Sequence, residues 1–283
     1  MSDGYIKSNL HTHSTFCDGK DSLEQNVVTA IEKGIKVLGF SSHSMYPFHT
    51  EANMRPERFP DYCAEIHRLQ KEYGDRITIR LAFEADFIPG ISLPSHERYA
   101  DFAPDYLIGS VHFIFQRAGI FAVDDTPEIW ADGAKRYYKG DMKTLISDYF
   151  ELEKEMLALC DFELLAHPDL VRKFNEKYPL FNEDDGWYKD LLKDMAKAIA
   201  RSGKATEINT GAISRKWLTK PYPSLYFLSL LREAGVPLAI TADAHAAENL
   251  DCAFDEARAL AKKAGYTEII YDINKAGFKL CKI

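Results

Sequence analysis

The chain carries histidine and acidic residues at the ends of short apolar segments, where side chains of these types can bind metal ions. In chain order the groups read HTH followed by Asp18, then SSH, EAD, SVH, AHPD, EINTG and DAH. Six of the nine histidines belong to these groups. Neutral imidazole and carboxylate are ligands that Zn, Mn and Fe accept. The pattern therefore predicts a metal site built from nitrogen and oxygen ligands.

Spacing within the groups indicates which side chains can meet. Residues i and i+2 of a strand point to the same side, so His11 and His13 can share one ion, and Asp243 and His245 can converge on the same pocket. A single histidine at a strand end is more often a hydrogen-bonded core or rim residue than a ligand. Six histidines and three acidic residues on the same predicted rim are hard to explain as hydrogen-bonded core or rim residues. They favour a centre that binds several metal ions. The candidate ligands are His11, His13, Asp18, His43, Glu84, His112, His167, Asp243 and His245.

Short β-rich segments, mostly apolar on both faces, alternate with segments of helical periodicity. The expected strands are Tyr5–Leu10, Val37–Ser41, Ile77–Phe83, Tyr106–Val111, Phe162–Ala166, Ala205–Asn209 and Pro237–Thr241, with a late run at Glu268–Tyr271. Apolar residues on both faces are typical of parallel strands covered by helices. Repeated strand–helix alternation indicates a closed or nearly closed parallel barrel, with an open doubly wound sheet as the alternative.

The expected helices would place the strand ends on one rim. Ser22 and Gln25 resemble a capping box, and Gly34 lies where a glycine would end that helix. Three longer segments look like insertions: Ser44–Pro60, Pro89–Pro104 and Phe115–Gly140. Because each follows a strand, we expect all three on the rim that carries the candidate ligands.

Composition narrows the possible partners. The chain has 283 residues, 46% of them hydrophobic, and a formal net charge of −8, which disfavours a general nucleic-acid-binding surface. No apolar run is long enough to span a membrane, and no secretory signal is visible at the N-terminus. The five cysteines are odd in number, scattered and without a CxxC pair. We therefore expect reduced thiols, a cytoplasmic location and no thiolate zinc site.

The order of these groups resembles that of the polymerase-and-histidinol-phosphatase (PHP) superfamily. The resemblance rests on HTHSTFCDG, SSH, FEADF, GSVHF, LLAHPDL, EINTG and TADAH, between about residue 5 and about residue 270. EADFIPG, HPDLVRKF and INTGAISRK are most similar to histidinol-phosphate phosphatases of the PHP type. The resemblance implies an α/β fold, a distorted (β/α)7 TIM-like barrel, as a single domain over residues 1–283.

The same resemblance implies a centre of two to three divalent ions, with Zn, Mn or Fe as candidates. The first ion would be bound by His11, His13, Glu84 and Asp243. The second would share Glu84 and add His112 and His167. The third would be bound by Asp18, His43 and His245. Some relatives have histidine in place of Asp18, and a carboxylate there favours a harder ion or weaker occupancy.

The resemblance also implies a reaction, the hydrolysis of L-histidinol phosphate to L-histidinol and phosphate in histidine biosynthesis. We expect direct attack by a metal-bridging hydroxide, with Arg172 and Arg215 binding the phosphoryl oxygens. Asp18, His245 or a metal-bound water would protonate the leaving group, and His49 could line the pocket. The partner would be a small phosphate ester, with no nucleic acid or membrane. Nothing in the sequence indicates the oligomeric state.

Three alternatives remain at this point. The first is a PHP-type phosphoesterase that acts on another small phosphate ester or on a nucleotide. The second is an amidohydrolase-type enzyme, but no lysine lies at a middle strand end, where such enzymes usually need one. The third is a non-catalytic metal-binding barrel, which retention of all nine ligand types disfavours.

Overall fold

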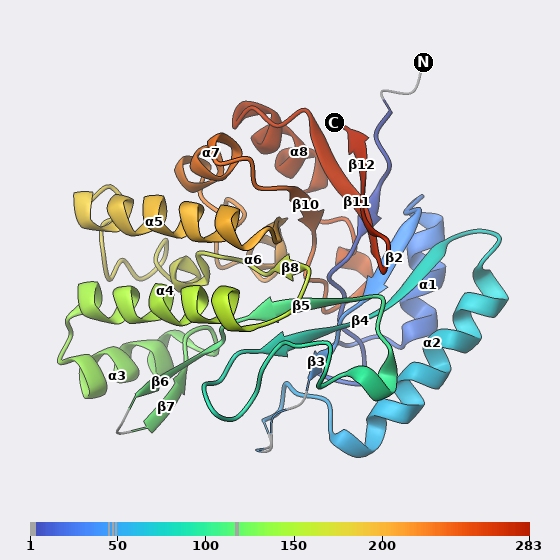
Figure 1. The fold of residues 1–283 in the computed structure, drawn as a ribbon, viewed down its shortest axis with the longest axis horizontal. Helices are drawn as coiled ribbons and strands as arrows, with labels where there is room; N and C mark the ends of the chain where they lie inside the picture. The colour runs from blue at the N-terminus through green and yellow to red at the C-terminus, as the bar shows by residue number, and fades with distance from the viewer. Residues whose placement is uncertain (1–3, 45, 47, 49, 117–118) are drawn as a thin grey trace.

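The computed structural model describes residues 4–44, 46, 48, 50–116 and 119–283. Ten strands of this part form one sheet (Figure 1). Its path runs β1 (Ser8–Asn9), β2 (Val37–Phe40), β4 (Thr78–Asp86), β5 (Tyr106–Ser110), β8 (Leu164–Leu165), β9 (Ala205–Asn209), β10 (Leu238–Thr241), β11 (Glu268–Asn274), β12 (Gly277–Lys282), and β3 (His43–Ser44) pairs with β4. All neighbours are parallel except β11 and β12.

The sheet curls until its first strand approaches β10. Thr12, just after β1, forms a parallel bridge with Ala244, just after β10. The amide of His13 donates to the carbonyl of Ala244 at 2.9 Å, and the amide of Ala244 donates to the carbonyl of His11 at 3.2 Å. Residues near the two ends of the chain therefore lie side by side at the carboxyl ends of the strands.

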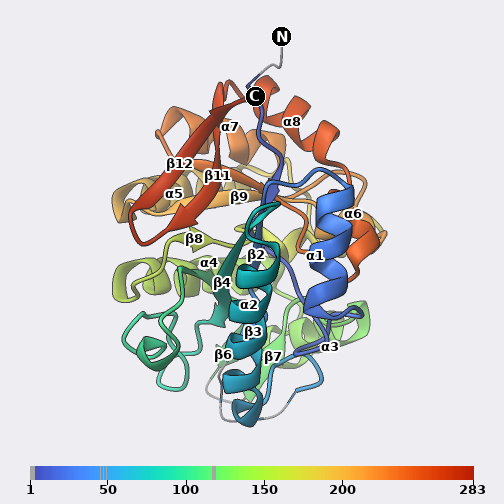
Figure 2. The same ribbon diagram turned by 90° about the vertical axis from the view of Figure 1, so that its right-hand side faces the viewer.

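Helices cover the outer face of the curled sheet (Figures 1 and 2). They are α1 (Leu23–Glu32), α2 (Phe59–Tyr73), α3 (Pro127–Tyr138), α4 (Met142–Leu159), α5 (Gly186–Ser202), α6 (Gly211–Ser214), α7 (Leu225–Glu233) and α8 (Phe254–Lys263), with 3-10 turns η1 (Pro56–Arg58), η2 (Ala100–Phe102), η3 (Leu170–Arg172) and η4 (Ala247–Asn249). The expected capping box opens α1, and Gly34 follows it at φ +73°. In the described part of the chain, no helix combines the length and apolarity needed to cross a membrane.

The inner face of the sheet is packed around one large side chain. Tyr106 is fully buried there, and its hydroxyl donates to the carbonyl of Leu10 at 2.5 Å. A Cβ atom on Gly39 would lie 1.8 Å from that hydroxyl, so only glycine fits this position of β2. The other inner positions include the small residues Ala82, Ala166, Ala205 and Ala239. The interior is therefore filled beneath the strand ends, as in a barrel core.

Each parallel strand along the sheet path from β1 to β11 was expected from the sequence, but the bounds of several of them differ. The expected Tyr5–Leu10 and Phe162–Ala166 strands shorten to two residues each, whereas β4 extends to Asp86. The hairpin of β6 (Phe113–Gln116) and β7 (Gly119–Ala122) was not expected, and neither were β3 and β12. The open doubly wound alternative is wrong, because strand order follows chain order along the whole path and never reverses.

An ion pair links β4 to β11 and gives a test of the fold. The guanidinium of Arg80 donates to both carboxylate oxygens of Asp272 at 2.8 Å, and the Asp272 side chain is 2% exposed. We expect Arg80→Met to lower the free energy of unfolding by about 2–3 kcal/mol in urea titrations, because it removes both charge-assisted hydrogen bonds of the guanidinium and leaves the buried carboxylate with Lys279 and Asn274. Lys193→Met breaks an exposed pair on α5 and should leave stability unchanged.

The effect of Arg80→Met should depend on pH. Burial opposes ionisation of Asp272, but Arg80 and Lys279 outweigh it and lower its pKa. A lowered carboxyl pKa contributes stability above the unfolded value of about 3.9, and that contribution is lost as pH falls through the folded value. The difference between wild type and variant should be largest near neutral pH and shrink below about pH 4. An equal difference at pH 3 and pH 7 would contradict this account.

Candidate metal centre

The structure brings all nine candidate ligands together at the carboxyl ends of the strands. Glu84 lies in β4, His43 begins β3, and the other seven follow strands β1, β5, β8 and β10. The parallel register of His43 with Glu84 sets two of them side by side. Every ligand lies within 4.0 Å of another through a nitrogen–oxygen contact.

The first group of ligands surrounds one oxygen of Glu84. Glu84 Oε2 lies 3.1 Å from His11 Nε2 and 3.4 Å from His13 Nε2. Asp243 Oδ1 lies 3.1 Å from the same nitrogen of His13 and 3.7 Å from that of His11. All four side chains are buried. Four oxygen and nitrogen atoms therefore face one small space, and they belong to the four residues that the family resemblance assigns to the first ion.

The second group surrounds the other oxygen of Glu84. Its Oε1 lies 3.4 Å from His112 Nε2 and 3.2 Å from His167 Nε2, and these two nitrogens are 3.3 Å apart. Ser110 donates its hydroxyl to Oε1 at 2.6 Å and fixes the orientation of the carboxylate. Glu84 thus faces two groups of histidines at once, one with each oxygen.

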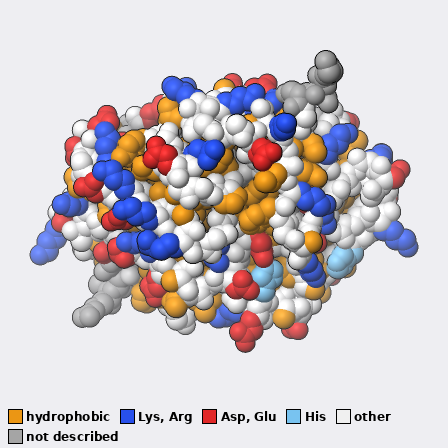
Figure 3. Space-filling view, turned by 45° about the horizontal axis from the view of Figure 1, so that its top comes forward, with side chains coloured by type: hydrophobic (Ala, Val, Ile, Leu, Met, Phe, Trp, Pro, Cys, Tyr) orange, Lys and Arg blue, Asp and Glu red, His pale blue; other side chains and the backbone are white. Residues whose placement is uncertain are grey.

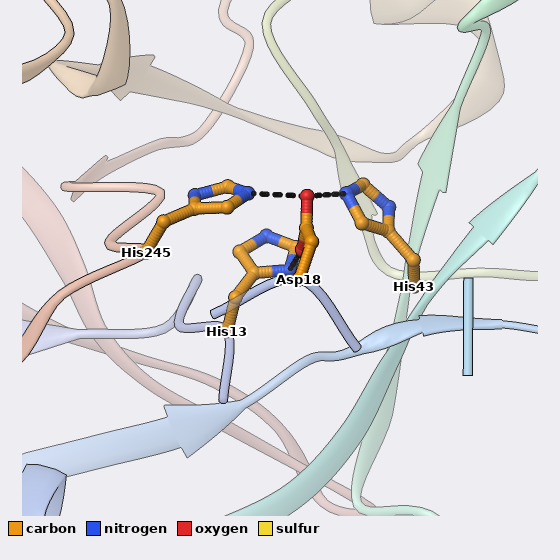
Figure 4. Close-up of side chains that lie close together, drawn as sticks. All are labelled: His13, Asp18, His43 and His245. Carbon is orange, nitrogen blue, oxygen red and sulfur yellow. Dashed lines mark ion pairs between the residues drawn. The ribbon is translucent and has the colours of Figure 1, made fainter. Parts of the chain in front are cut away.

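The third group is built around Asp18 (Figure 4). Its carboxylate lies between two rings, with Oδ2 3.2 Å from His245 Nε2 and 4.0 Å from His43 Nε2. His13 Nδ1 lies 3.7 Å from Oδ1. The other nitrogen of His43 is 3.0 Å from Glu84 Oε2, so this ring connects the third group to the first. With side chains 30% and 22% exposed, Asp18 and His245 form the most open part of the centre.

Unpartnered buried atoms show that a cation fits this arrangement. His11 Nε2, His13 Nε2 and Glu84 Oε2 are buried and have no hydrogen-bond partner among the described residues. Such atoms cost free energy unless a ligand satisfies them. Tetrahedral ligands about 2.0–2.1 Å from a zinc ion lie about 3.3 Å apart, close to the spacing seen here. The chemistry and spacing of the donors therefore fit a divalent metal ion.

Two of the candidate ligands, His13 and Asp243, have pKa values that favour metal binding near pH 7. Burial, His245 and His43 lower the pKa of His13 to about 3, so its ring is neutral and its lone pair available near pH 7. Burial opposes ionisation of Asp243, but Arg215 and His11 hold its pKa well below the ordinary value. The centre therefore presents carboxylates together with at least one neutral imidazole.

Two carboxylates contact the histidine nitrogens that face away from the centre, and neither was expected there from the sequence. Glu207 contacts His11 Nδ1 with both oxygens, at 3.1 and 3.2 Å. Asp86 Oδ1 lies 2.7 Å from His112 Nδ1. A carboxylate on the far nitrogen fixes the tautomer of a metal-binding histidine and aims the other nitrogen at the ion. Asp86 could have been found, because it lies two residues after Glu84 and so on the same face of β4.

Arg215 lies in the centre, and its contacts explain the geometry of Asp243. Its guanidinium donates to the carboxylate of Asp243 at 2.9 Å and to its carbonyl at 3.2 Å, and lies 3.0 Å from His245 Nδ1. Asp243 has a left-handed backbone (φ +47°). Asp243 and His245 therefore converge through a turn, and not because they alternate along a strand. A Cβ on Gly211 would lie 2.6 Å from Arg215, which explains the glycine of the EINTG segment.

Two expected substrate-binding residues, Arg172 and His49, are not found in the described cavity wall. Arg172 does not line the cavity, so its expected phosphate-binding role is not supported. The 3-10 turn η3 directs its guanidinium to Glu183 at 2.6 Å and to Asp169 at 3.3 Å, and only 9% of the side chain is exposed. Two carboxylates already neutralise it. His49 lies outside the described residues.

A cavity of about 800 Å³ opens onto the centre. Two of the expected insertions contribute to its described wall. These lining residues are Tyr46, Thr50, Glu51 and Ala52 from the first, and Ala122, Asp124 and Asp125 from the third. No described residue of Pro89–Pro104 lines it. The wall is completed by Phe113, Leu170 and Lys173.

Comparison with known proteins places the chain in a family. A family model described as the PHP domain matches residues 9–211, and the chain belongs to this family. It is 30% identical to a probable histidinol-phosphatase of Deinococcus radiodurans over 83% of this chain and 85% of that protein. It is 28% identical to a probable histidinol-phosphatase of Schizosaccharomyces pombe over 92% of this chain and 87% of that protein.

Two solved structures share the fold. One is a putative histidinol phosphatase of Listeria monocytogenes, with a TM-score of 0.79, 20% identity, and coverage of 88% of this chain and 99% of that one. The other is the histidinol phosphate phosphatase of Lactococcus lactis in complex with zinc, L-histidinol and phosphate. Its TM-score is 0.74 at 22% identity, with coverage of 96% of this chain and 98% of that one.

The position of Glu84 between two groups of histidines predicts how metal content responds to mutation. We expect Glu84→Gln to lose at least two ions per chain, because each carboxylate oxygen faces a different group. Asp18→Asn should lose at most one, because Asp18 belongs only to the open third group. Elemental analysis after gel filtration measures both, and a Glu84→Gln protein with wild-type metal content would contradict the bridging role.

Proposed function

We propose that the protein is a metal-dependent phosphomonoesterase that hydrolyses L-histidinol phosphate to L-histidinol and phosphate in histidine biosynthesis. The observation that carries the proposal is the cluster of nine candidate ligands, most of them buried, onto which a cavity opens, with Arg215 beside them. The similarity to proteins named histidinol-phosphatase over most of the chain supports this substrate. The zinc, L-histidinol and phosphate in the Lactococcus lactis structure support it further.

The proposed architecture is a distorted (β/α)7 barrel. Seven parallel strands, from β1 through β10 with β3 as an extension beside β4, lie in chain order. The Thr12–Ala244 bridge joins the first of these to the last. Active sites of such barrels lie at the carboxyl ends of the strands, where the nine ligands are found.

The proposed centre holds two to three divalent ions, of Zn, Mn or Fe. The ligand sets are those of the three groups: His11, His13, Glu84 and Asp243 for the first, Glu84, His112 and His167 for the second, and Asp18, His43 and His245 for the third. Bound ions of this kind supply positive charge for the phosphoryl group and activate water for attack on phosphorus.

The protein's own residues would bind the phosphate and move a proton. Arg215 lines the cavity and presents a planar cation suited to phosphoryl oxygens, while it also holds Asp243 and His245 in place. Asp18 and His245 lie 3.2 Å apart on the open side of the centre, where a leaving alkoxide can reach them. We assign the proton to this pair when the centre holds two ions; with a third ion bound to them, a water on that ion would supply it.

The cavity offers suitable partners for the organic part of the substrate. L-Histidinol carries an ammonium group and an imidazole ring. The described wall has aromatic rings at Tyr46 and Phe113, whose centroids lie 5.8 Å apart, and carboxylates at Glu51 and Asp125. Aromatic faces and carboxylates both attract such cationic groups. On the face shown in Figure 3, basic and acidic side chains are interspersed, which suits a small ester better than a nucleic acid.

A panel of phosphate esters tests the substrate. Protein stripped with a chelator and reloaded with Mn²⁺ or Zn²⁺ should release phosphate from histidinol phosphate at the highest kcat/KM. Nucleoside monophosphates and sugar phosphates serve as comparison esters. A clear preference for one of those would replace the substrate and keep the class of reaction, whereas no release from any ester would remove the phosphatase proposal.

The two arginines make a matched pair of variants. Arg215→Met should raise KM for histidinol phosphate roughly tenfold or more, because it removes a charge-assisted contact from the cavity. Arg172→Met should leave KM within about twofold but lower thermal stability, because Asp169 and Glu183 lose their buried partner. A strong rise of KM in Arg172→Met alone would reverse these assignments.

A further inference from the structure

The cavity wall carries far more negative than positive charge. Its described lining includes the carboxylates Asp18, Glu51, Glu84, Asp124, Asp125 and Asp243. Against these it includes two side chains that carry a full positive charge near pH 7, Arg215 and Lys173. A phosphate dianion needs cationic hydrogen-bond donors in addition to metal ions. Any protein contact of that kind in the described wall must come from these two residues.

Lys173 is a buried lysine in the cavity wall. The residue is only 7% exposed, and lysines are rarely so buried unless paired. Its ammonium donates to the carbonyl of Asp124 at 2.5 Å and to the Asp124 carboxylate at 3.1 Å. An ammonium has three N–H donors. The ring centroid of Phe174 lies 5.5 Å from the ammonium nitrogen, but among the described residues no oxygen acceptor is seen for the third donor, although the side chain lines the cavity.

The surrounding backbone fixes this lysine beside the second group of ligands. The amide of Leu170 donates to the carbonyl of His167 at 2.9 Å, and the amide of Lys173 donates to Leu170 at 2.8 Å. After strand β5, the amide of Val123, next to Asp124, donates to the carbonyl of His112 at 2.9 Å. Lys173 and its partner are therefore anchored to both histidines of the second group.

Arg215 is anchored elsewhere, to Asp243 and His245. The two cations thus approach the centre from different ligand groups, one beside the second and the other beside the first and third. Asp124 remains ionised near pH 7, because the pairing with Lys173 outweighs burial and lowers its pKa. The Lys173–Asp124 pair is therefore charged near pH 7.

We propose that Lys173 is a second phosphate-binding residue, whose ammonium contacts a phosphoryl oxygen on the side of the centre away from Arg215. The backbone carbonyl of Asp124 holds the ammonium in the cavity wall, and its carboxylate is the counter-charge that competes with phosphate for it. The inference rests on the proposed function for the presence of a phosphate ester in the cavity. It gives the lysine of the HPDLVRKF segment the role that the sequence had given to its neighbour Arg172.

The test measures binding of inorganic phosphate to the full chain loaded with Mn²⁺, by titration calorimetry. Lys173→Met removes the charge and keeps the length of the side chain, and we expect the Kd for phosphate to rise roughly ten- to hundredfold. Lys173→Arg should retain most of the affinity. Lys177→Met is the matched control: this exposed lysine lies four residues further along, over the ring of Trp217, and does not line the cavity. Its Kd should equal that of the wild type.

Variants of Asp124 separate phosphate binding from a purely structural ion pair. Asp124→Asn keeps the ammonium and removes the competing carboxylate, so phosphate should bind as well as in the wild type, or more tightly. The double variant Asp124→Asn with Lys173→Met leaves no unpaired charge and covers the case in which Lys173→Met alone does not fold. It should bind phosphate as weakly as Lys173→Met.

The outcomes distinguish this inference from the proposed function. Three results would overturn the role of Lys173. The first is wild-type phosphate affinity in folded Lys173→Met or in the double variant, and the second is a loss of affinity in Asp124→Asn equal to that in Lys173→Met. The third is a wild-type protein that binds no phosphate at millimolar concentration. If the wild type binds phosphate through Lys173 but does not hydrolyse histidinol phosphate, the substrate is wrong and Lys173 keeps its role. If it hydrolyses histidinol phosphate and Lys173→Met leaves both Kd and KM unchanged, only this inference fails.

Discussion

The structure depends on the burial of a single carboxylate, Glu84, with a histidine group at each oxygen. A buried carboxylate surrounded by lone pairs is unfavourable unless cations compensate it. The surrounding architecture follows from that requirement. Ligands must come from several strands, so the sheet has to curl until β1 and β10 meet. Their rings must not rotate, so Glu207 and Asp86 hold them from behind.

The metal centre could be predicted from the sequence because parallel strands impose a simple geometry. Once the apolar segments are recognised as parallel strands, all residues that follow them lie on one rim. No knowledge of side-chain conformation is needed to place His43 near Glu84. This explains why the nine candidate ligands lie together as expected, although two of the strands proved to be only two residues long.

Prediction failed where the chain leaves the strands, because there the direction of a side chain depends on the turn. The 3-10 turn after His167 places Arg172 against Glu183 and Asp169, away from the cavity, and leaves Lys173 in the cavity wall. One residue of difference in a turn reverses which cation faces the site. The β6–β7 hairpin was missed for a related reason: it lies inside a segment read as an irregular insertion. Asp243 was placed correctly for a wrong reason, since its convergence with His245 requires a left-handed residue.

The bridge between Thr12 and Ala244 has a consequence for how the protein is made. The first group of ligands joins residues near the start of the chain to Asp243, more than two hundred positions later. During synthesis His11 and His13 leave the ribosome long before their acidic partner exists. High-affinity binding of the first ion must therefore wait until nearly the whole chain has been made and the sheet has closed. An ion bound by the first group then cross-links residues near the two ends of the polypeptide. It stabilises the complete fold but not a chain that lacks Asp243.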